Sequence, residues 1–320
     1  GLLNLPGGAA ALIGPVLGGV IAESIWGWRG LYWGTIPLML VAGGLVVAGL
    51  PVNTPKIKPR IDVWGTFVMV FATTTLIIGF SWLGVAGKLG LAVILLVISL
   101  IAWAGFIVIE KKVEAPILDP QIFLNRTFMT AAGAALLSFF GTLCIVAYSP
   151  IFVQDVMHID PITSGSMLTP YSTLVAFLGV PTGFLLARTR KYKWMYNLGY
   201  PVVTLAMFAM WRFTANTPVW LYILVTSVAG LGLGVIPTVN TLVAQFAVPR
   251  RLLGGAVGAI FFFQMIGISV APALLGLAQN SASDLEGGLK LVFLVGAITM
   301  LISLLVIRTI PEVSMDGRDT

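Results

Sequence analysis

Long uncharged runs follow one another along the chain, separated by short segments that hold most of the charged residues. A helix needs roughly 20 mainly apolar residues to cross the hydrocarbon core of a bilayer, and each run comes close to that length or exceeds it. The regular alternation of apolar and polar residues that is typical of a membrane β-barrel is missing. We therefore predict an all-α polytopic membrane protein with about ten transmembrane helices. Their approximate ranges are 3–25, 31–51, 63–86, 89–109, 127–153, 163–187, 194–212, 219–247, 254–278 and 290–308.

The charged segments indicate how the predicted helices are oriented. If successive loops alternate between the two sides of the membrane, one side receives fourteen of the 18 Lys and Arg residues. An excess of positive charge marks the cytoplasmic side, so both ends of the chain, the C-terminus included, are expected in the cytoplasm. Hydrophobic residues make up 58% of the chain and charged residues 9%, as expected for a chain embedded in a bilayer. The basic residues are scattered over short loops, which explains the net charge of +6 without a nucleic-acid partner.

Two proline-containing connections divide the predicted helices into groups of two, two and six. Residues 51–60 hold three prolines and three basic residues, and residues 110–126 hold Pro116 and Pro120. A short internal repeat superposes residues 269–277 on residues 12–20, with Pro272 on Pro15. Repeated helical bundles are a common architecture of transporters. We therefore expect the last six helices to form one bundle and the first two to end another, with about four more helices before Gly1.

Several landmarks resemble one family in the order in which they occur. Drug/proton antiporters of the major facilitator superfamily carry a G-P-x-x-G-G motif on their fifth span, and Gly14-Pro15-Val16-Leu17-Gly18-Gly19 resembles it. The segment that begins Trp28-Arg29-Gly30 and continues to Pro37 is similar to the start of the family's sixth span. Further along, residues 230–237 and 245–258 resemble the twelfth and thirteenth spans of the fourteen-span multidrug branch.

This resemblance implies a major facilitator fold, with the ten predicted helices equivalent to spans five to fourteen. It implies three parts: residues 1–61 as the last two helices of the N-terminal bundle with a cytoplasmic linker, 62–112 as an extra two-helix hairpin, and 113–320 as the C-terminal six-helix bundle. It further implies a secondary active transporter in the plasma membrane, working by alternating access, that exports drugs or amphipathic compounds in exchange for protons. Its partners would then be the lipid bilayer, a small-molecule substrate, protons and the missing N-terminal helices, with no cofactor.

Particular residues carry these expectations. Gly14, Pro15, Gly18 and Gly19 are expected to form a closely packed, bent helix at the interface between bundles. Residues 183–191 resemble a degenerate form of the family's G-x-L-x-D-R-x-G-R loop, in which Arg188 and Lys191 remain, Ala187 replaces the acid and Arg190 replaces the second glycine. All twelve acids lie at the ends of predicted helices or in loops, so the acid that carries the proton is expected before Gly1.

Neutral polar side chains on the last six helices are the candidates for contact with a substrate. Their spacing places Thr238, Thr241 and Gln245 on one side of a predicted helix, with Asn240 beside them. The full set of candidates for the substrate path is Tyr171, Thr173, Thr238, Asn240, Thr241, Gln245 and Gln264. Hydrogen bonding between helices is the alternative role for each of them and stays open.

Other function classes remain as alternatives. An uptake carrier or a metabolite exporter on the same fold stays open, because a fold does not determine a substrate. A membrane scaffold or enzyme would be a different class, but the sequence shows no converging catalytic groups and no metal-ligand cluster. The glycines Gly230, Gly232 and Gly234 lie within a predicted helix, so they do not form a nucleotide-binding loop. We expect a transporter and not an enzyme.

Overall fold

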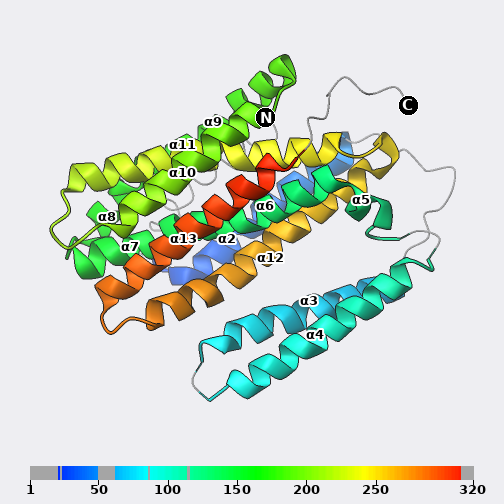
Figure 1. Ribbon diagram of the computed structural model, residues 1–320, viewed down its shortest axis with the longest axis horizontal. Coiled ribbons are helices and arrows are strands. Elements are labelled where there is room, and N and C mark those ends of the chain that lie inside the picture. The colour runs from blue at the N-terminus through cyan, green and yellow to red at the C-terminus, as the bar shows by residue number, and fades with distance from the viewer. Residues whose placement is uncertain (1–20, 22–23, 50–61, 86, 114–115, 311–320) are drawn as a thin grey trace.

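The computed structural model describes residues 21, 24–49, 62–85, 87–113 and 116–310. These residues form helices joined by short turns, and no strand occurs among them (Figure 1). The long helices are α2 (Gly27–Gly49), α3 (Val63–Leu83), α4 (Leu89–Glu110), α6 (Arg126–Leu143), α9 (Thr169–Thr189), α10 (Lys193–Trp211), α11 (Val219–Phe246), α12 (Leu253–Asn280) and α13 (Leu285–Arg308). The short ones are α5 (Pro120–Leu124), α7 (Ser149–Ile151), α8 (Pro161–Met167) and the 3₁₀ turn η4 (Arg250–Leu252), with the π-helical segments η2 (Cys144–Tyr148) and η3 (Phe152–Val156). The predicted all-α polytopic fold is confirmed.

The helices from α6 to α13 pack into one group, which we call the C-terminal bundle. In it α6 packs against α11, α12 and α13, while α10 lies against both α11 and α13. Helix α9 packs mainly on α11, and α12 also contacts α13 (Figure 1). Its core combines apolar side chains with phenols that are completely buried. The largest of these side chains are Tyr196, Tyr200, Tyr222, Phe128, Phe152 and Phe293.

Helices α3 and α4 form a hairpin beside the C-terminal bundle, where α3 packs on α12 (Figure 1). The two helices approach closely at Gly79, where an added Cβ would lie 2.9 Å from the side chain of Leu96. The hydroxyl of Ser99 donates to the carbonyl of Ala72 at 2.7 Å and joins the two helices. Most of the remaining hairpin surface is apolar and exposed, as with Leu100 at 72%. Such a surface suits contact with lipid.

Nine of the ten predicted spans coincide with helices of the described part, and the span over residues 3–25 lies almost entirely outside it. Eight of the described helices are long and apolar enough to cross a membrane. Helix α10 is not among these eight, although it coincides with the predicted span 194–212. Its first turns contain Lys193, Asn197 and three aromatic residues with polar atoms, which lower its apolar content.

Many acids at the helix ends have a structural role. Asp62 accepts from the backbone N–H of Gly65 at 2.8 Å and caps the start of α3. Asp160 and Asp284 cap α8 and α13 in the same way. A cap of this kind satisfies one of the free N–H groups in the first turn and stabilises a helix by about 1 kcal/mol. The capping geometry explains why these acids stand at the ends of spans.

The span between Arg126 and Val156 is irregular in a way that the hydropathy pattern does not predict. Pro150 lies near its C-terminal end, and π-helical segments occur before and after it, at η2 and η3. Proline has no N–H to donate, so the backbone around it must rearrange its hydrogen bonds. The predicted span 163–187 is also interrupted, because α8 ends at Met167 and α9 begins at Thr169 with Pro170 in its first turn.

Candidate functional site

The antiporter-like residues Gly14, Pro15, Gly18 and Gly19 lie outside the described residues. The acid Glu23 lies outside them as well. The site can therefore be built only from the C-terminal bundle. There the predicted substrate-path residues divide into three groups according to what their side chains contact.

The first group is a buried polar network centred on Asn240. The amide oxygen of Asn240, which is fully buried, accepts a hydrogen bond from the hydroxyl of Tyr196 at 2.8 Å. The hydroxyl of Tyr200 lies 3.5 Å from the amide nitrogen of Asn240 and 3.0 Å from Oγ of Ser138. Ser138 in turn donates to the carbonyl of Ala134 at 2.6 Å. The network joins α6, α10 and α11, so for Asn240 the geometry favours the interhelical role.

The second group consists of buried side chains between neighbouring helices. Tyr171, 4% exposed, packs on α11 at Gly230, where an added Cβ would lie 3.1 Å from the carbonyl oxygen of Tyr171. Gln264, 6% exposed, lies one turn from Gly267, and an added Cβ at Gly267 would lie 2.5 Å from a carbonyl of α6. Tyr171 and Gln264 therefore lie on different seams of the bundle. Thr238 is also buried, on α11.

The third group consists of side chains that are half-buried. The hydroxyls of Thr173 and Thr241 donate to the carbonyls of Thr169 and Pro237, one turn earlier in their own helices, at 2.8 and 2.9 Å. Gln245 lies in the last turn of α11 and is half-buried. It follows Gly230, the neighbour of Tyr171, by 15 residues, or about 22 Å along a helix. One small ligand cannot contact both ends of this set.

Three alternate glycines explain how α11 is seated in the bundle. At Gly234, an added Cβ would lie 2.9 Å from the carbonyl oxygen of Leu174 on α9. At Gly232, it would lie 2.6 Å from the carbonyl oxygen of Gly199 on α10. Gly230 and Gly234 are one turn apart and face α9, whereas Gly232 lies between them and faces α10. Backbones that approach this closely are typical of helix packing in membranes. This segment is therefore a packing element on two sides of α11.

The irregular C-terminal part of the span from Arg126 to Val156 contacts α11 and α12 through groups that sequence reasoning missed. The hydroxyls of Ser149 and Tyr222 share a hydrogen bond between α7 and α11. The hydroxyl of Tyr148 donates to the carbonyl of Pro272 in α12 at 3.2 Å. Pro272 belongs to the segment that repeats the pattern around Pro15. The residue that could have drawn attention to this region in the sequence is Pro150. Single π-helical turns inside α-helices are frequent at functional sites.

The loop after α9 shows why a glycine is expected at one of its positions. Helix α9 ends at Thr189, and Arg190 follows in the left-handed conformation with φ of 52°. A residue with a side chain pays about 1–2 kcal/mol for this conformation, and glycine does not. Arg190 is the residue that stands at the second glycine of the degenerate loop. Arg188 is exposed in the last turn of α9, and Lys191 is exposed in the loop.

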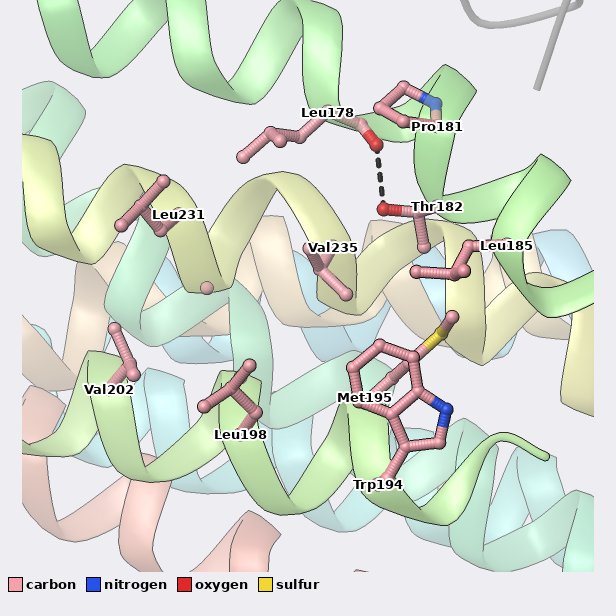
Figure 2. A pocket seen from close by; sticks show the side chains of 12 residues that line it. Leu178, Pro181, Thr182, Leu185, Trp194, Met195, Leu198, Val202, Leu231 and Val235 are labelled. Carbon is pink, nitrogen blue, oxygen red and sulfur yellow. Dashed lines mark hydrogen bonds between the residues drawn. The ribbon is translucent and has the colours of Figure 1, made fainter. Parts of the chain in front are cut away.

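A cavity of about 310 Å³ lies between α9, α10 and α11 (Figure 2). Figure 2 shows Leu178 and Leu185 of α9 opposite Leu198 of α10, with Trp194 on the α10 side. The polar groups in its wall are the hydroxyl of Thr182, which donates to the carbonyl of Leu178 at 2.6 Å, and the indole N–H of Trp194. None of the predicted substrate-path residues lines this cavity. It suits an acyl chain or another apolar group and offers no recognition of charge.

Comparison with known proteins identifies the family to which this helical fold belongs. Residues 1–272 match the Major Facilitator Superfamily. The chain belongs to this superfamily. The members of this superfamily are transporters and not enzymes, and the chain is a multi-pass membrane protein.

Curated relatives cover most of this chain. An uncharacterized MFS-type transporter of Mycobacterium tuberculosis is 28% identical over 278 residues, which are 86% of this chain and 40% of the relative. The multidrug transporter protein MdtP of Bacillus subtilis is 24% identical over 278 residues, 86% of this chain and 51% of that protein. Multidrug resistance protein 3 of Bacillus subtilis is 24% identical over 302 residues, 91% of this chain and 58% of that protein. The chain thus spans about half the length of these relatives.

Proposed function

We propose that the complete protein is a proton-coupled exporter of drugs or other amphipathic compounds in the plasma membrane. The observation that carries this proposal is the G-P-x-x-G-G pattern at residues 14–19, inside a region that matches the superfamily. Two of the relatives named above are multidrug proteins, which supports efflux over uptake. The distribution of basic residues supports a cytoplasmic C-terminus.

Alternating access in this family of folds is largely a rigid movement of one bundle against another. The C-terminal bundle has the features that such a movement needs. Its helices approach closely at Gly232 and Gly234, and the Asn240 network joins three of them in the interior. We propose the same three parts that the sequence suggests: residues 1–61, the hairpin 62–112 and the bundle 113–320.

Within this proposal, Gly14, Pro15, Gly18 and Gly19 form a seam between the two bundles, and substrate contacts come from the half-buried members of the polar set. Arg188 and Lys191 lie at the cytoplasmic face. Thr241 and Gln245 are the strongest substrate-path candidates of the described chain, because they are half-buried on α11 and are not committed to the buried network.

A substitution in the seam tests the proposal. In the complete protein, Gly18→Leu is expected to abolish export of the lipophilic cation ethidium from cells, while the protein still reaches the membrane. The control is Gly105→Leu on α4, where an added Cβ meets nothing within 4 Å among the described residues. Export is measured as the rate of ethidium loss from preloaded, energised cells. Normal export by Gly18→Leu would contradict the role of the seam.

A further inference from the structure

A second, larger cavity lies outside the substrate path, where the hairpin meets the C-terminal bundle. It has a volume of about 640 Å³, is open on one side and is lined by residues of α4, α5 and α12. Five aromatic rings contribute to its wall: Trp103, Phe106, Phe123, Phe262 and Phe263. The ring of Trp103 lies 5.4 Å from that of Phe106 and 5.5 Å from that of Phe262, so the aromatic wall is continuous across α4 and α12.

One carboxylate also lines this aromatic cavity. Glu110, the last residue of α4, is 4% exposed. Its Oε1 accepts from the backbone N–H of Ile117 at 3.2 Å, which ties α4 to the segment before α5. Its other oxygen, Oε2, is buried and meets no donor among the described residues. An ionised carboxylate buried in this way is costly unless a cation or hydrogen-bond donors compensate it.

The surroundings of Glu110 add to this cost. Asp62, 8% exposed, lies near enough for its charge to act unfavourably on Glu110, and Oδ2 of Asp62 also lacks a donor within the described ranges. Lys111 contributes to the mouth of the cavity but is exposed, and the described residues contain no ion pair between it and Glu110. Among the described residues, backbone N–H groups compensate the carboxylate of Glu110 only in part, so the cavity combines a partly compensated negative charge with aromatic walls.

These features select one chemical class of ligand. A neutral ligand would leave the charge of Glu110 only partly compensated, and an anion would be repelled by both acids. An organic cation would supply the missing charge, and the faces of aromatic rings attract such cations. A small rotation of the Glu110 side chain would bring the buried Oε2 to the cavity surface, where an N–H group on the ligand would donate a charge-assisted hydrogen bond to it.

We propose that the aromatic cavity is a binding site for an organic cation with an N–H donor and an apolar body, its nitrogen at Glu110 and its body against the aromatic wall. This inference rests on the proposed function in one respect, since such cations are among the compounds that the exporter would carry. Two sources offer this chemistry: a lipophilic cationic compound from the cytoplasmic leaflet, or the ammonium headgroup of phosphatidylethanolamine.

Thiol protection in the complete protein tests occupancy directly. Leu124 lines the cavity and is 84% exposed, so Leu124→Cys places a reactive thiol at its mouth. The native Cys144 is completely buried and gives little background labelling. Protein in phosphatidylglycerol nanodiscs is labelled with a maleimide at increasing concentrations of ethidium. We expect ethidium to slow labelling at least fivefold, and not to slow labelling of Leu198→Cys at the 310 Å³ cavity.

Three further variants separate charge from structure. Glu110→Gln keeps an acceptor for the N–H of Ile117 but removes the charge, and should raise the half-protecting ethidium concentration at least tenfold, as expected when a hydrogen bond to a charged group is lost. Asp119→Asn is the control: it removes the charge of a nearby carboxylate but keeps the side-chain oxygen that caps α5. It should change the half-protecting ethidium concentration less than twofold. Phe123→Leu removes one aromatic face and should weaken protection at least threefold.

The possible results all bear on the inference. Equal protection in wild type, Glu110→Gln and Phe123→Leu would overturn it, as would the absence of protection in wild type. If added phosphatidylethanolamine displaces ethidium from wild type but not from Glu110→Gln, the headgroup is the natural occupant. If added phosphatidylethanolamine does not change the protection by ethidium, the occupant is a lipophilic cationic compound. Ethidium export is measured separately in cells. Protection without export would contradict the proposed function alone, and export without protection would contradict this site alone.

Discussion

The Asn240 network allows a sharp distinction between a structural role and a substrate contact. Replacing Asn240 by Leu keeps the volume of the side chain but removes the acceptor for the hydroxyl of Tyr196, which is 0% exposed and lies 2.8 Å away. Leaving a buried hydroxyl without a partner costs about 1–3 kcal/mol. Tyr200 is less affected, because its hydroxyl keeps Ser138 at 3.0 Å.

Removing both partners should largely restore stability. In Tyr196→Phe/Asn240→Leu neither orphaned polar group remains, and replacing both partners by apolar groups of similar shape is nearly neutral. Polar pairs between membrane helices average only about 0.6 kcal/mol. We therefore expect each single variant to lose about 1–3 kcal/mol and the double variant to lose less than about 1 kcal/mol.

The assay is unfolding of the complete protein in detergent, followed by circular dichroism. For a cooperative unit of about 150–250 residues, such as the C-terminal bundle, 1 kcal/mol corresponds to roughly 2–4 °C in Tm. The control combines Asn240→Leu with Tyr171→Phe. Tyr171 lies on another seam of α11, so the losses of stability from these two substitutions should be additive. Additive losses in Tyr196→Phe/Asn240→Leu would refute the network. Unchanged stability combined with weaker ethidium binding by Asn240→Leu would instead identify Asn240 as a substrate contact.

Two further predictions concern the packing of α11 and the loop after α9. Gly232→Ala should lower the stability of the complete protein by about 1–3 kcal/mol, because its Cβ would lie 2.6 Å from a backbone carbonyl on α10. The control Gly258→Ala, where the space is open, should be neutral or raise stability by up to about 1 kcal/mol. Equal effects of the two substitutions in thermal unfolding would contradict the packing argument. Arg190→Gly should raise stability by about 1 kcal/mol, because glycine adopts the left-handed conformation without steric cost; a fall in Tm would show that contacts of the arginine outweigh its backbone strain.

The hydropathy pattern was sufficient for most of the fold. Because lipid requires each backbone group to be satisfied within its own segment, long apolar runs can form little else than helices. The predicted ends of α3, α11 and α12 agree with the structure to within three residues. Helix α10 was predicted from its flanking charges, Lys193 and Arg212, despite its weaker apolar character.

The candidate site was harder to predict, because a single sequence does not say which helices are neighbours. Asn240 was selected as a substrate-path candidate, with hydrogen bonding between helices as the alternative, but its partner Tyr196 lies 44 positions away on another helix. Glu110 was placed only among the acids at span ends or in loops, and the packing of α5 and α12 around it shows that it is buried. The π-helical turns around Pro150 depend on the missing N–H of this proline, which hydropathy does not measure. The motif at residues 14–19 stays a prediction.

Transport by the complete protein in proteoliposomes is the most direct test of the central claim. Vesicles with an acidic interior, and with the membrane potential clamped by potassium and valinomycin, are supplied with ethidium outside, and protein-free vesicles serve as the control. The proposed exchange of protons for cations predicts accumulation of ethidium that collapses when nigericin dissipates the pH gradient, and that is lost in Gly18→Leu. Accumulation that is independent of the pH gradient, or none above the protein-free control, would contradict proton-coupled export.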